Sequence, residues 1–248
     1  MTLNHPPINT IDDQMYDELF DLVEAMDAEP SLKVVTFESA NPDFFIAHYG
    51  IGESRSRFDK PRWIETSARL AHSNVVSIAV VRGRARGGGS EFALACDMRF
   101  ASREKAIFGQ LEIGFGLIPG GGAPQRLPLL VGRARALEIV LGADDFDAET
   151  AEKYGWINRA LPDAELDGFV ANIVRRVLSF DGQALAINKS VLNQTGLPDY
   201  AQLQVAQTVF GAALRLPDAS ERLTKARERG LGAIGEYELN IGHYAGGS

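Results

Sequence analysis

The 248-residue sequence predicts an α/β protein that ends in a helical region. Three observations support this class. Short apolar segments alternate with amphipathic helical segments as far as Ala160. The run Val75–Val81 leads through glycines into a helical segment, which is typical of a buried strand followed by a tight turn. From Pro162 onward the hydrophobic spacing is helical throughout.

The run Val75–Val81 is too short for a globular helix and is rich in β-branched residues, so we expect a buried strand. After Gly87–Gly89, Ser90 can cap a helix, and Glu91 would lie in its first turn, where a carboxylate complements the helix dipole. The turn would aim backbone N–H groups at one place, which suits a developing negative charge. A second carboxylate, Glu112, follows in the segment FGQLEIGFG.

The N-terminal elements follow from periodicity and from residues that start or stop helices. A helix is expected at Asp12–Glu29, with Asp12 or Thr10 as its cap and Pro30 as its stop. Its apolar residues have helical spacing: Met15, Leu19, Leu22, Val23 and Met26. A strand is expected at Leu32–Glu38, and a further helix around Trp63.

The second half adds one strand and several helices. The strand is expected at Trp156–Ala160, and the helices at Pro124–Gly142, Ala148–Tyr154, Asp163–Leu178, Gln183–Asn193, Pro198–Leu214 and Asp218–Arg229. The glycine-rich tail from Asn240 is expected to be loose. We divide the chain into a core, residues 1–190, and a C-terminal helical region, residues 191–248.

Composition narrows the classes of function. With 45% hydrophobic and 23% charged residues, the chain can bury a sizeable core. The net charge of −8 argues against a nucleic-acid partner. The lone Cys96 excludes an internal disulfide and is expected to be a small core residue. No apolar run approaches the ~20 residues of a membrane span. The start MTLNHPP lacks signal-peptide features, so we expect a cytoplasmic protein.

Two long segments together resemble the core motif of the crotonase superfamily, whose type member is enoyl-CoA hydratase. They are GRARGGGSEFALACDMRFAS at 83–102 and FGQLEIGFGLIPGGGAPQRL at 108–127. The resemblance extends to TLNHPPINTI at 2–11, FFIAHYG at 44–50 and DAETAEKYGWINRALP at 147–162. It implies an α/β crotonase-like ββα spiral core, with C-terminal helices that assemble a homotrimer or a dimer of trimers. Family members have a strand pair before and around TLN, so here either an edge is missing or the assigned start is late.

The resemblance also implies roles for individual residues. Glu91 and Glu112 match the family's catalytic pair, and the backbone N–H groups of Tyr49 and Gly88 match its oxyanion hole. Further substrate-binding positions are Ala47, His48, Gly87, Gly89 and Arg84. The glutamates are separated by one residue more than in the hydratases. The extra residue lies in ASREKAIF, a turn between strands, so it should not move either carboxylate.

Three departures from the family pattern concern side chains near this site. Where relatives read roughly F-S-A-G-A-D, His48 replaces the glycine, and it is expected to be a hydrogen-bonded packing residue rather than an acid or base. Arg84 and Arg86 replace apolar or aromatic residues, so phosphate contact and simple surface ion pairing both stay open. The basic segment 55–62 is either a solvated face or a cationic rim for the phosphates of coenzyme A.

The function implied is addition of water to a trans-2-enoyl-CoA thioester. No metal and no cofactor beyond the coenzyme A of the substrate is expected. Two carboxylates can share the proton transfers if their environments give them different pKa values. One alternative is an isomerase of the same superfamily, for which a glutamate at Glu112 suffices. The other is a non-catalytic acyl-CoA-binding or RNA-binding relative. The segment Gly114–Gly122 has no ionisable side chain and matches no nucleotide-binding loop.

Overall fold

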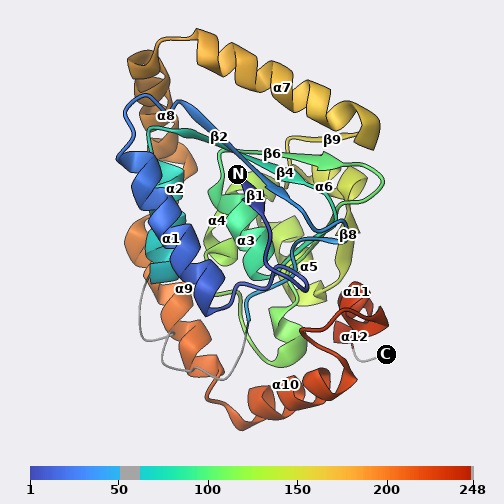
Figure 1. Ribbon diagram of the computed structural model, residues 1–248. Coiled ribbons are helices and arrows are strands. Elements are labelled where there is room, and N and C mark those ends of the chain that lie inside the picture. Colours follow the sequence, from blue (N-terminus) through green and yellow to red (C-terminus); the bar gives the residue numbers. More distant parts are fainter. Residues whose placement is uncertain (51–61, 247–248) are drawn as a thin grey trace.

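The computed structural model describes residues 1–50 and 62–246, and within them the chain forms two sheets with helices around them (Figure 1). In the larger sheet the strand order is β1-β2-β4-β6-β9, and in the smaller one it is β3-β5-β7-β8. The strands are β1 (Thr2–Leu3), β2 (Val34–Ser39), β3 (Phe44–Ile46), β4 (Val76–Val81), β5 (Arg84–Arg86), β6 (Met98–Ser102), β7 (Ile107–Gly109), β8 (Asp145–Asp147) and β9 (Arg159–Leu161).

From β2 to β7, successive strands alternate between the two sheets, which makes this part of the chain a spiral. β2, β4 and β6 are parallel neighbours in the larger sheet. The strands that follow each of them, β3, β5 and β7, are parallel neighbours in the smaller sheet. A helix follows β3 and another follows β5. This is the predicted ββα spiral, and it confirms the expected fold class.

The helices are α1 (Asp13–Asp27), α2 (Arg62–His72), α3 (Gly88–Ala95), α4 (Ala123–Val131), α5 (Arg133–Gly142), α6 (Ala148–Tyr154), α7 (Asp163–Ser179), α8 (Gly182–Gly196), α9 (Tyr200–Ala213), α10 (Pro217–Arg229), α11 (Glu236–Leu239) and α12 (Ile241–Ala245). Asp12 caps α1 by accepting the Met15 N–H at 3.0 Å, as one of the two expected caps. The predicted division at residue 190 stays a prediction, and that residue lies within α8.

Three element boundaries were predicted wrongly. The helix expected at 124–142 is two helices, because Gly132 has a positive φ of 78° between them. α3 begins at Gly88 rather than after Ser90, since Gly87 turns the chain with a φ of 48°. The last strand is Arg159–Leu161, because Trp156 and Ile157 are packed in the core instead of paired in the sheet.

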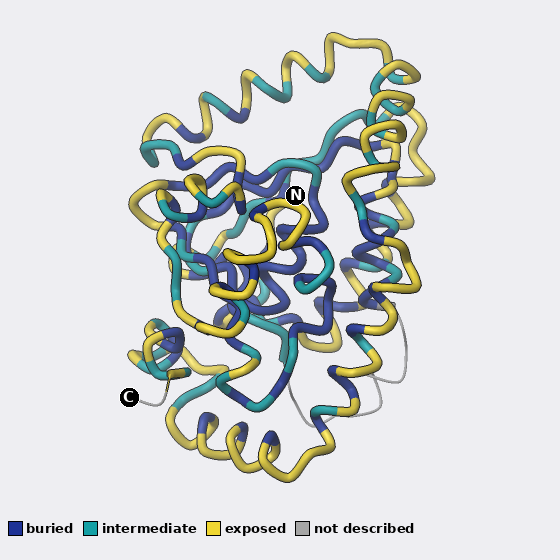
Figure 2. The backbone as a smooth tube through the Cα atoms, turned by 180° about the vertical axis from the view of Figure 1, so that it is seen from behind, coloured by how far each residue is buried: buried dark blue, intermediate teal, exposed yellow. Residues whose placement is uncertain are grey.

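The main core lies between the sheets, around α3. Every residue of β4 and of α3 is buried, which explains why neither segment shows a polar face. Cys96, at the end of α3, is buried as expected. α7 crosses the other face of the larger sheet (Figure 1) and packs through Leu166 and Val170 on β4 and β6. The tube in Figure 2 shows buried residues concentrated in the middle of the molecule.

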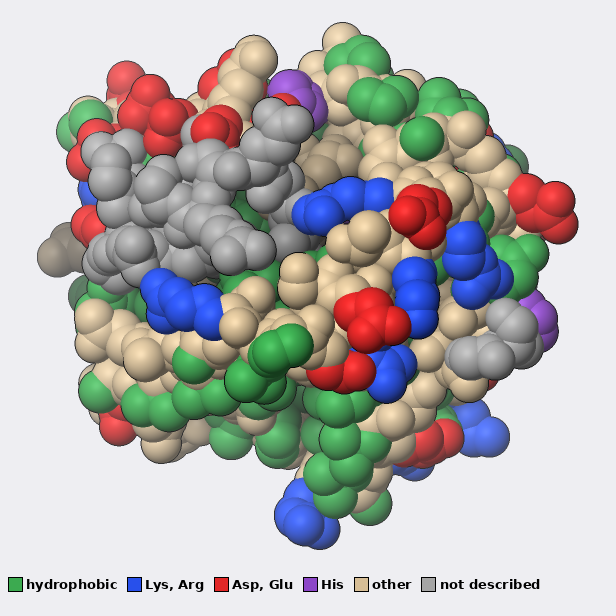
Figure 3. All heavy atoms as spheres, turned by 90° about the horizontal axis from the view of Figure 1, so that it is seen from below, with side chains coloured by type: hydrophobic (Ala, Val, Ile, Leu, Met, Phe, Trp, Pro, Cys, Tyr) green, Lys and Arg blue, Asp and Glu red, His purple; other side chains and the backbone are tan. Residues whose placement is uncertain are grey.

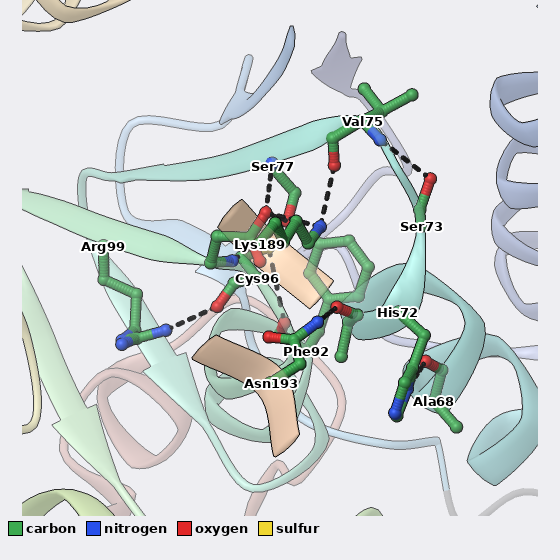
Figure 4. Close-up of polar contacts among 12 residues, drawn as sticks. Ala68, His72, Ser73, Val75, Ser77, Phe92, Cys96, Arg99, Lys189 and Asn193 are labelled. Atoms are coloured by element: carbon green, nitrogen blue, oxygen red, sulfur yellow. Dashed lines mark hydrogen bonds and ion pairs between the residues drawn. The ribbon is translucent and has the colours of Figure 1, made fainter. Parts of the chain in front are cut away.

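α8 is attached to the core by polar contacts. Lys189 Nζ lies 2.8 Å from the Val75 carbonyl and 2.7 Å from a carboxylate oxygen of Asp97. Asn193 donates to the Ala71 carbonyl at 3.0 Å. Figure 4 shows Lys189 and Asn193 pointing from the helix toward this part of the core. None of residues 182–196 is buried, so the apolar side chains of α8 remain on the surface.

The C-terminal helices form a second core against the turn that contains Glu112. Phe210, Leu223 and Ile241 pack there with Leu111 and Phe115. Outside this cluster α10 is polar. Figure 3 views the molecule from the end where α10 lies and shows Lys and Arg interspersed with Asp and Glu. The tail was expected to be loose, but residues 241–245 form α12. That prediction was wrong, because Ile241 is buried in the second core.

Candidate active site

Glu91 is the first of the two predicted catalytic carboxylates, and it is nearly enclosed. It lies in the first turn of α3 and is 3% exposed. Its Oε1 atom accepts the N–H of Gly121 at 2.7 Å and the N–H of Ala123 at 3.0 Å. Burial raises the pKa of Glu91 above its ordinary value, although these hydrogen bonds and the Arg126 guanidinium oppose the rise. A carboxyl in such a setting can exchange a proton near neutral pH.

Glu112 is the second carboxylate, and it begins the 3-10 helix η2 (Glu112–Phe115). Its Oε2 atom is buried and has no hydrogen-bond partner among the described residues. Burial first, and then repulsion from Glu91, raise the pKa of Glu112. Since the ionised form of each carboxyl disfavours that of the other, they titrate as a pair. The segment ASREKAIF at 101–108 contains the expected turn, between β6 and β7, and the place of the extra residue within it stays a prediction.

The backbone of Tyr49 approaches the start of α3 at Gly88. A Cβ added to Gly88 would lie 3.1 Å from the Tyr49 nitrogen and 3.0 Å from its Cβ. Gly88 is the first residue of α3, so its N–H has no acceptor within the helix. An oxyanion hole formed by both N–H groups requires this close approach of the two backbone segments, and their role there stays a prediction.

Both carboxylates face one pocket. Its lining is Tyr49, Trp63, Gly88, Glu91, Glu112, Gly120, Gly121, Gln207 and Phe210. An adjoining pocket shares four of these residues and is otherwise almost entirely apolar. The adjoining pocket is lined by His48, Tyr49, Gly87, Gly88, Leu111, Glu112, Phe115, Leu117, Phe210, Leu223, Leu231 and Ile241. A chamber that contains two carboxylates, beside an apolar pocket, suits a reactive group that carries a hydrocarbon chain.

Several of these lining residues were not among the predicted site residues. Trp63 lies between Tyr49 and Phe92, with ring centroids 6.0 and 6.5 Å away. Phe210 comes from α9, and its ring lies against Gly120, where an added Cβ would overlap it. A tryptophan at the start of an amphipathic helix was a usable signal, but the C-terminal residues had none, because their approach depends on tertiary packing.

The predicted substrate-binding residues separate into two groups. His48 and Gly87 line the apolar pocket. Ala47 is fully buried in a small cluster with Ile8 and Phe44. Gly89 packs so closely on β3 that a Cβ would overlap the Ile46 carbonyl. These two positions therefore shape the backbone, and a direct contact with substrate stays a prediction for them.

The two arginines of β5 are engaged by the protein itself. Arg84 donates to the Leu239 carbonyl at 2.7 Å, and it is not among the described lining residues of either pocket. Arg86 is fully buried and forms a bidentate pair with Asp145. Of the two alternatives left open, ion pairing describes Arg86, but the pair is buried rather than at the surface as expected. The basic segment 55–62 lies outside the described residues, apart from Arg62 at the start of α2.

His48 is hydrogen-bonded within the protein, as expected of a packing residue, and its contact with substrate stays a prediction. Its Nδ1 atom lies 3.0 Å from the Tyr49 carbonyl, and its Nε2 atom lies 3.3 Å from a carboxylate oxygen of Glu238. Burial opposes the charged ring, but Glu238 outweighs this effect, and the pKa of His48 is raised. The neighbouring Arg86 acts in the opposite direction.

Within residues 1–50 and 62–246, no group of three or more His, Cys, Asp or Glu side chains could hold a metal ion. No helix in this part of the chain has the length and the apolar composition of a membrane span.

Comparisons with known proteins agree with the geometry. A family model described as enoyl-CoA hydratase/isomerase matches residues 1–230. A crotonyl-CoA hydratase from Syntrophomonas wolfei is 29% identical over 236 residues, which are 92% of this chain and 90% of that relative. A probable enoyl-CoA hydratase from Mycobacterium leprae is 30% identical over 201 residues, 79% of this chain and 77% of the relative.

Solved structures agree in fold as well. A Streptomyces avermitilis protein, provisionally named an enoyl-CoA hydratase, has 42% identity and a TM-score of 0.96, over 100% of this chain and 92% of its own. An enoyl-CoA hydratase from Mycobacterium avium subsp. paratuberculosis has 28% identity and a TM-score of 0.83, over 92% and 91% of the two chains. The chain therefore belongs to the enoyl-CoA hydratase/isomerase family of the crotonase superfamily.

Proposed function

We propose that this protein adds water to the double bond of a trans-2-enoyl-CoA thioester. The observation that supports this most is that Glu91 and Glu112 face one pocket beside the backbone of Tyr49 and Gly88. A hydratase needs two proton-transfer groups, whereas the isomerase alternative needs one. The hydratase names of two relatives are consistent with the proposal.

In the proposed reaction, one glutamate takes a proton from water as the water oxygen bonds to the β-carbon. The other supplies the proton that the α-carbon gains. Negative charge develops on the thioester oxygen between these steps, where the N–H groups of Tyr49 and Gly88 stabilise it. These protein groups supply the proton transfers and the charge stabilisation, so the proposal invokes no metal and no redox cofactor. Coenzyme A enters as part of the substrate.

The test is turnover of a panel of enoyl thioesters. Hydration removes the absorbance of the conjugated enone, and the product gains the mass of one water. The isomerase alternative predicts the opposite change, since moving a 3-enoyl double bond into conjugation raises this absorbance at constant mass. Binding of an acyl-CoA without either change would support the non-catalytic alternative and contradict the proposal.

We further propose that copies of the chain assemble as a trimer or a dimer of trimers. α8 presents large apolar side chains at the surface, among them Ile187, Val191 and Leu192. On α9, Val205 and Val209 are also exposed. Neighbouring helices that both expose apolar side chains are typical of a surface covered in an assembly.

A further inference from the structure

A buried ion pair joins the C-terminal segment to the pocket. The Glu238 side chain, on α11, is fully buried, and one of its oxygens lies 3.3 Å from His48 Nε2. Its other oxygen accepts the N–H of Gly232 at 2.9 Å. Since His48 Nδ1 lies 3.0 Å from the Tyr49 carbonyl, both ring nitrogens face acceptors. The contact between Nε2 and Glu238 lacks hydrogen-bond geometry, so it is a charge–charge contact, which requires the charged imidazolium.

The two arginines of β5 hold the same segment. Arg86 donates to the Glu238 carbonyl at 2.7 Å and to the Leu239 carbonyl at 3.0 Å, while it pairs with Asp145. Arg84 donates to the Leu239 carbonyl at 2.7 Å. Two arginines from β5 therefore meet the carbonyl end of α11, and His48, two residues after β3, meets its carboxylate.

This segment forms part of the apolar pocket wall. Leu231 and Ile241 line the pocket that adjoins the two catalytic carboxylates, and neither lines the chamber that contains Glu91. They lie on either side of Glu238 in the chain, and Leu231 is next to the Gly232 that Glu238 binds. Gly242, beside Ile241, lies against Asp145 so closely that no Cβ would fit.

We propose that His48 and Glu238, with Arg84 and Arg86, form a latch that holds residues 231–241 in the pocket wall and so limits the length of the acyl chain accepted. This inference rests on the proposed function. His48 and Glu238 are positioning residues in it. The latch requires a protonated His48. If the ring is neutral, the nearest cation to the Glu238 carboxylate is Arg86, whose charge is already balanced by Asp145.

The charged groups around the His48 ring decide the direction of its pH dependence. Glu238 from α11 favours the charged ring, and Arg86 from β5 disfavours it. Asp145 from β8 is paired with Arg86, and Glu112 from η2 lines the same pocket. The latch is therefore closed at lower pH and opens as rising pH removes the proton from His48.

The first measurement is acyl-chain preference in Glu238→Gln. The ratio of kcat/KM for trans-2-decenoyl-CoA to that for crotonyl-CoA should rise about tenfold or more, since the loosened wall admits a longer chain. The matched control is Glu221→Gln, on the exposed face of α10, where Glu221 pairs with Lys225 at 2.6 Å. The control should keep the wild-type ratio. An unchanged ratio in a folded Glu238→Gln protein would overturn the role in chain length.

The second measurement does not depend on activity. Amide hydrogen exchange of residues 232–245, corrected for intrinsic rates, should be slow at about pH 6 and faster at about pH 9 in the wild type and in Glu221→Gln. In Glu238→Gln it should be fast at both values. Exchange that is equally slow in all three proteins at both values would overturn the latch.

These outcomes separate the latch from the enzyme activity. If no enoyl thioester is turned over, the proposed function fails, and the exchange data still decide whether the latch exists. If Glu238→Gln does not fold, the pH series on the wild type decides it instead. If exchange behaves as expected but chain preference does not change, the latch stands and its control of the acyl pocket is refuted.

Discussion

The carboxylate of Glu91 accepts the backbone N–H of Gly121 at 2.7 Å, so the loop before α4 determines where the proposed acid/base group points. A Cβ at Gly121 would overlap both this carboxylate and the indole nitrogen of Trp63. We expect Gly121→Ala to lower kcat by ~10²-fold, because the carboxylate must move from its position. Gly168→Ala is the control, since nothing lies within 4 Å of a Cβ there. Equal turnover of both folded variants would contradict this dependence.

Replacement of either carboxyl tests the proton transfers directly. Glu91→Gln and Glu112→Gln should each lower kcat by ~10²-fold or more with little change in KM, because each group acts in the transition state. Steady-state hydration of crotonyl-CoA measures this. If Glu91→Gln retains hydratase-level turnover, the two-carboxylate mechanism is wrong and the isomerase alternative gains support.

Glu112→Gln should also change how stability depends on pH. Its folded-state pKa is raised above the ordinary 4.5, so the unfolded state releases its proton first and the native state loses stability as pH rises through that interval. Removing the carboxyl should therefore stabilise the protein at about pH 9, by on the order of 1 kcal/mol or more, and change little at about pH 4. Thermal melts of the wild type and the variant measure this. A gain that is the same at both pH values would contradict the assignment.

The oxyanion hole gives opposite expectations for two neighbouring positions. Tyr49→Ala keeps the backbone donor and should retain substantial turnover, while the loss of side-chain bulk beside the acyl path should change chain preference. Gly88→Val places a branched side chain where a Cβ is already 3.1 Å from the Tyr49 nitrogen. Misplacing one donor costs ~3 kcal/mol, or ~10²-fold in rate. A melting curve must show that the variant is folded, and unimpaired turnover of folded Gly88→Val would remove this turn from the mechanism.

Light scattering tests the proposed assembly. The wild type should have the mass of three chains or a multiple of three, and Leu192→Lys should shift it toward smaller species, since Leu192 is 71% exposed on α8. Leu216→Lys, at a 54% exposed position before α10, is the comparison and should leave the mass unchanged. A wild-type monomer at micromolar concentration would refute the assembly.

The sequence was most informative where local chemistry decides the structure. The run that became β4 and the cap of α1 were predicted because apolar spacing and an Asp side chain act within a few residues. The two glutamates were found through the motifs around them, and the structure brings both to one pocket.

Contacts between distant segments were beyond such reasoning. The short strands of the smaller sheet have three residues each, too few to show a period, and their pairing is set by the spiral. Ile241 lies in a glycine-rich tail that looks mobile in isolation, and it is ordered by a core that residues 111–117 complete. The approach of Phe210 to Gly120 depends in the same way on packing across the whole fold.

The contacts of α11 predict a pattern of sequence change among relatives. His48, Arg84 and Arg86 differ from the family pattern at three separate places in the sequence, yet all of them reach one four-residue helix. A mutation at any of these positions alone leaves a buried charge or carbonyl without its partner, so the residues should change together during evolution. Among relatives, a glycine at position 48 should accompany the loss of the acidic residue at 238, and pairwise covariation across a family alignment should recover the latch without any structure.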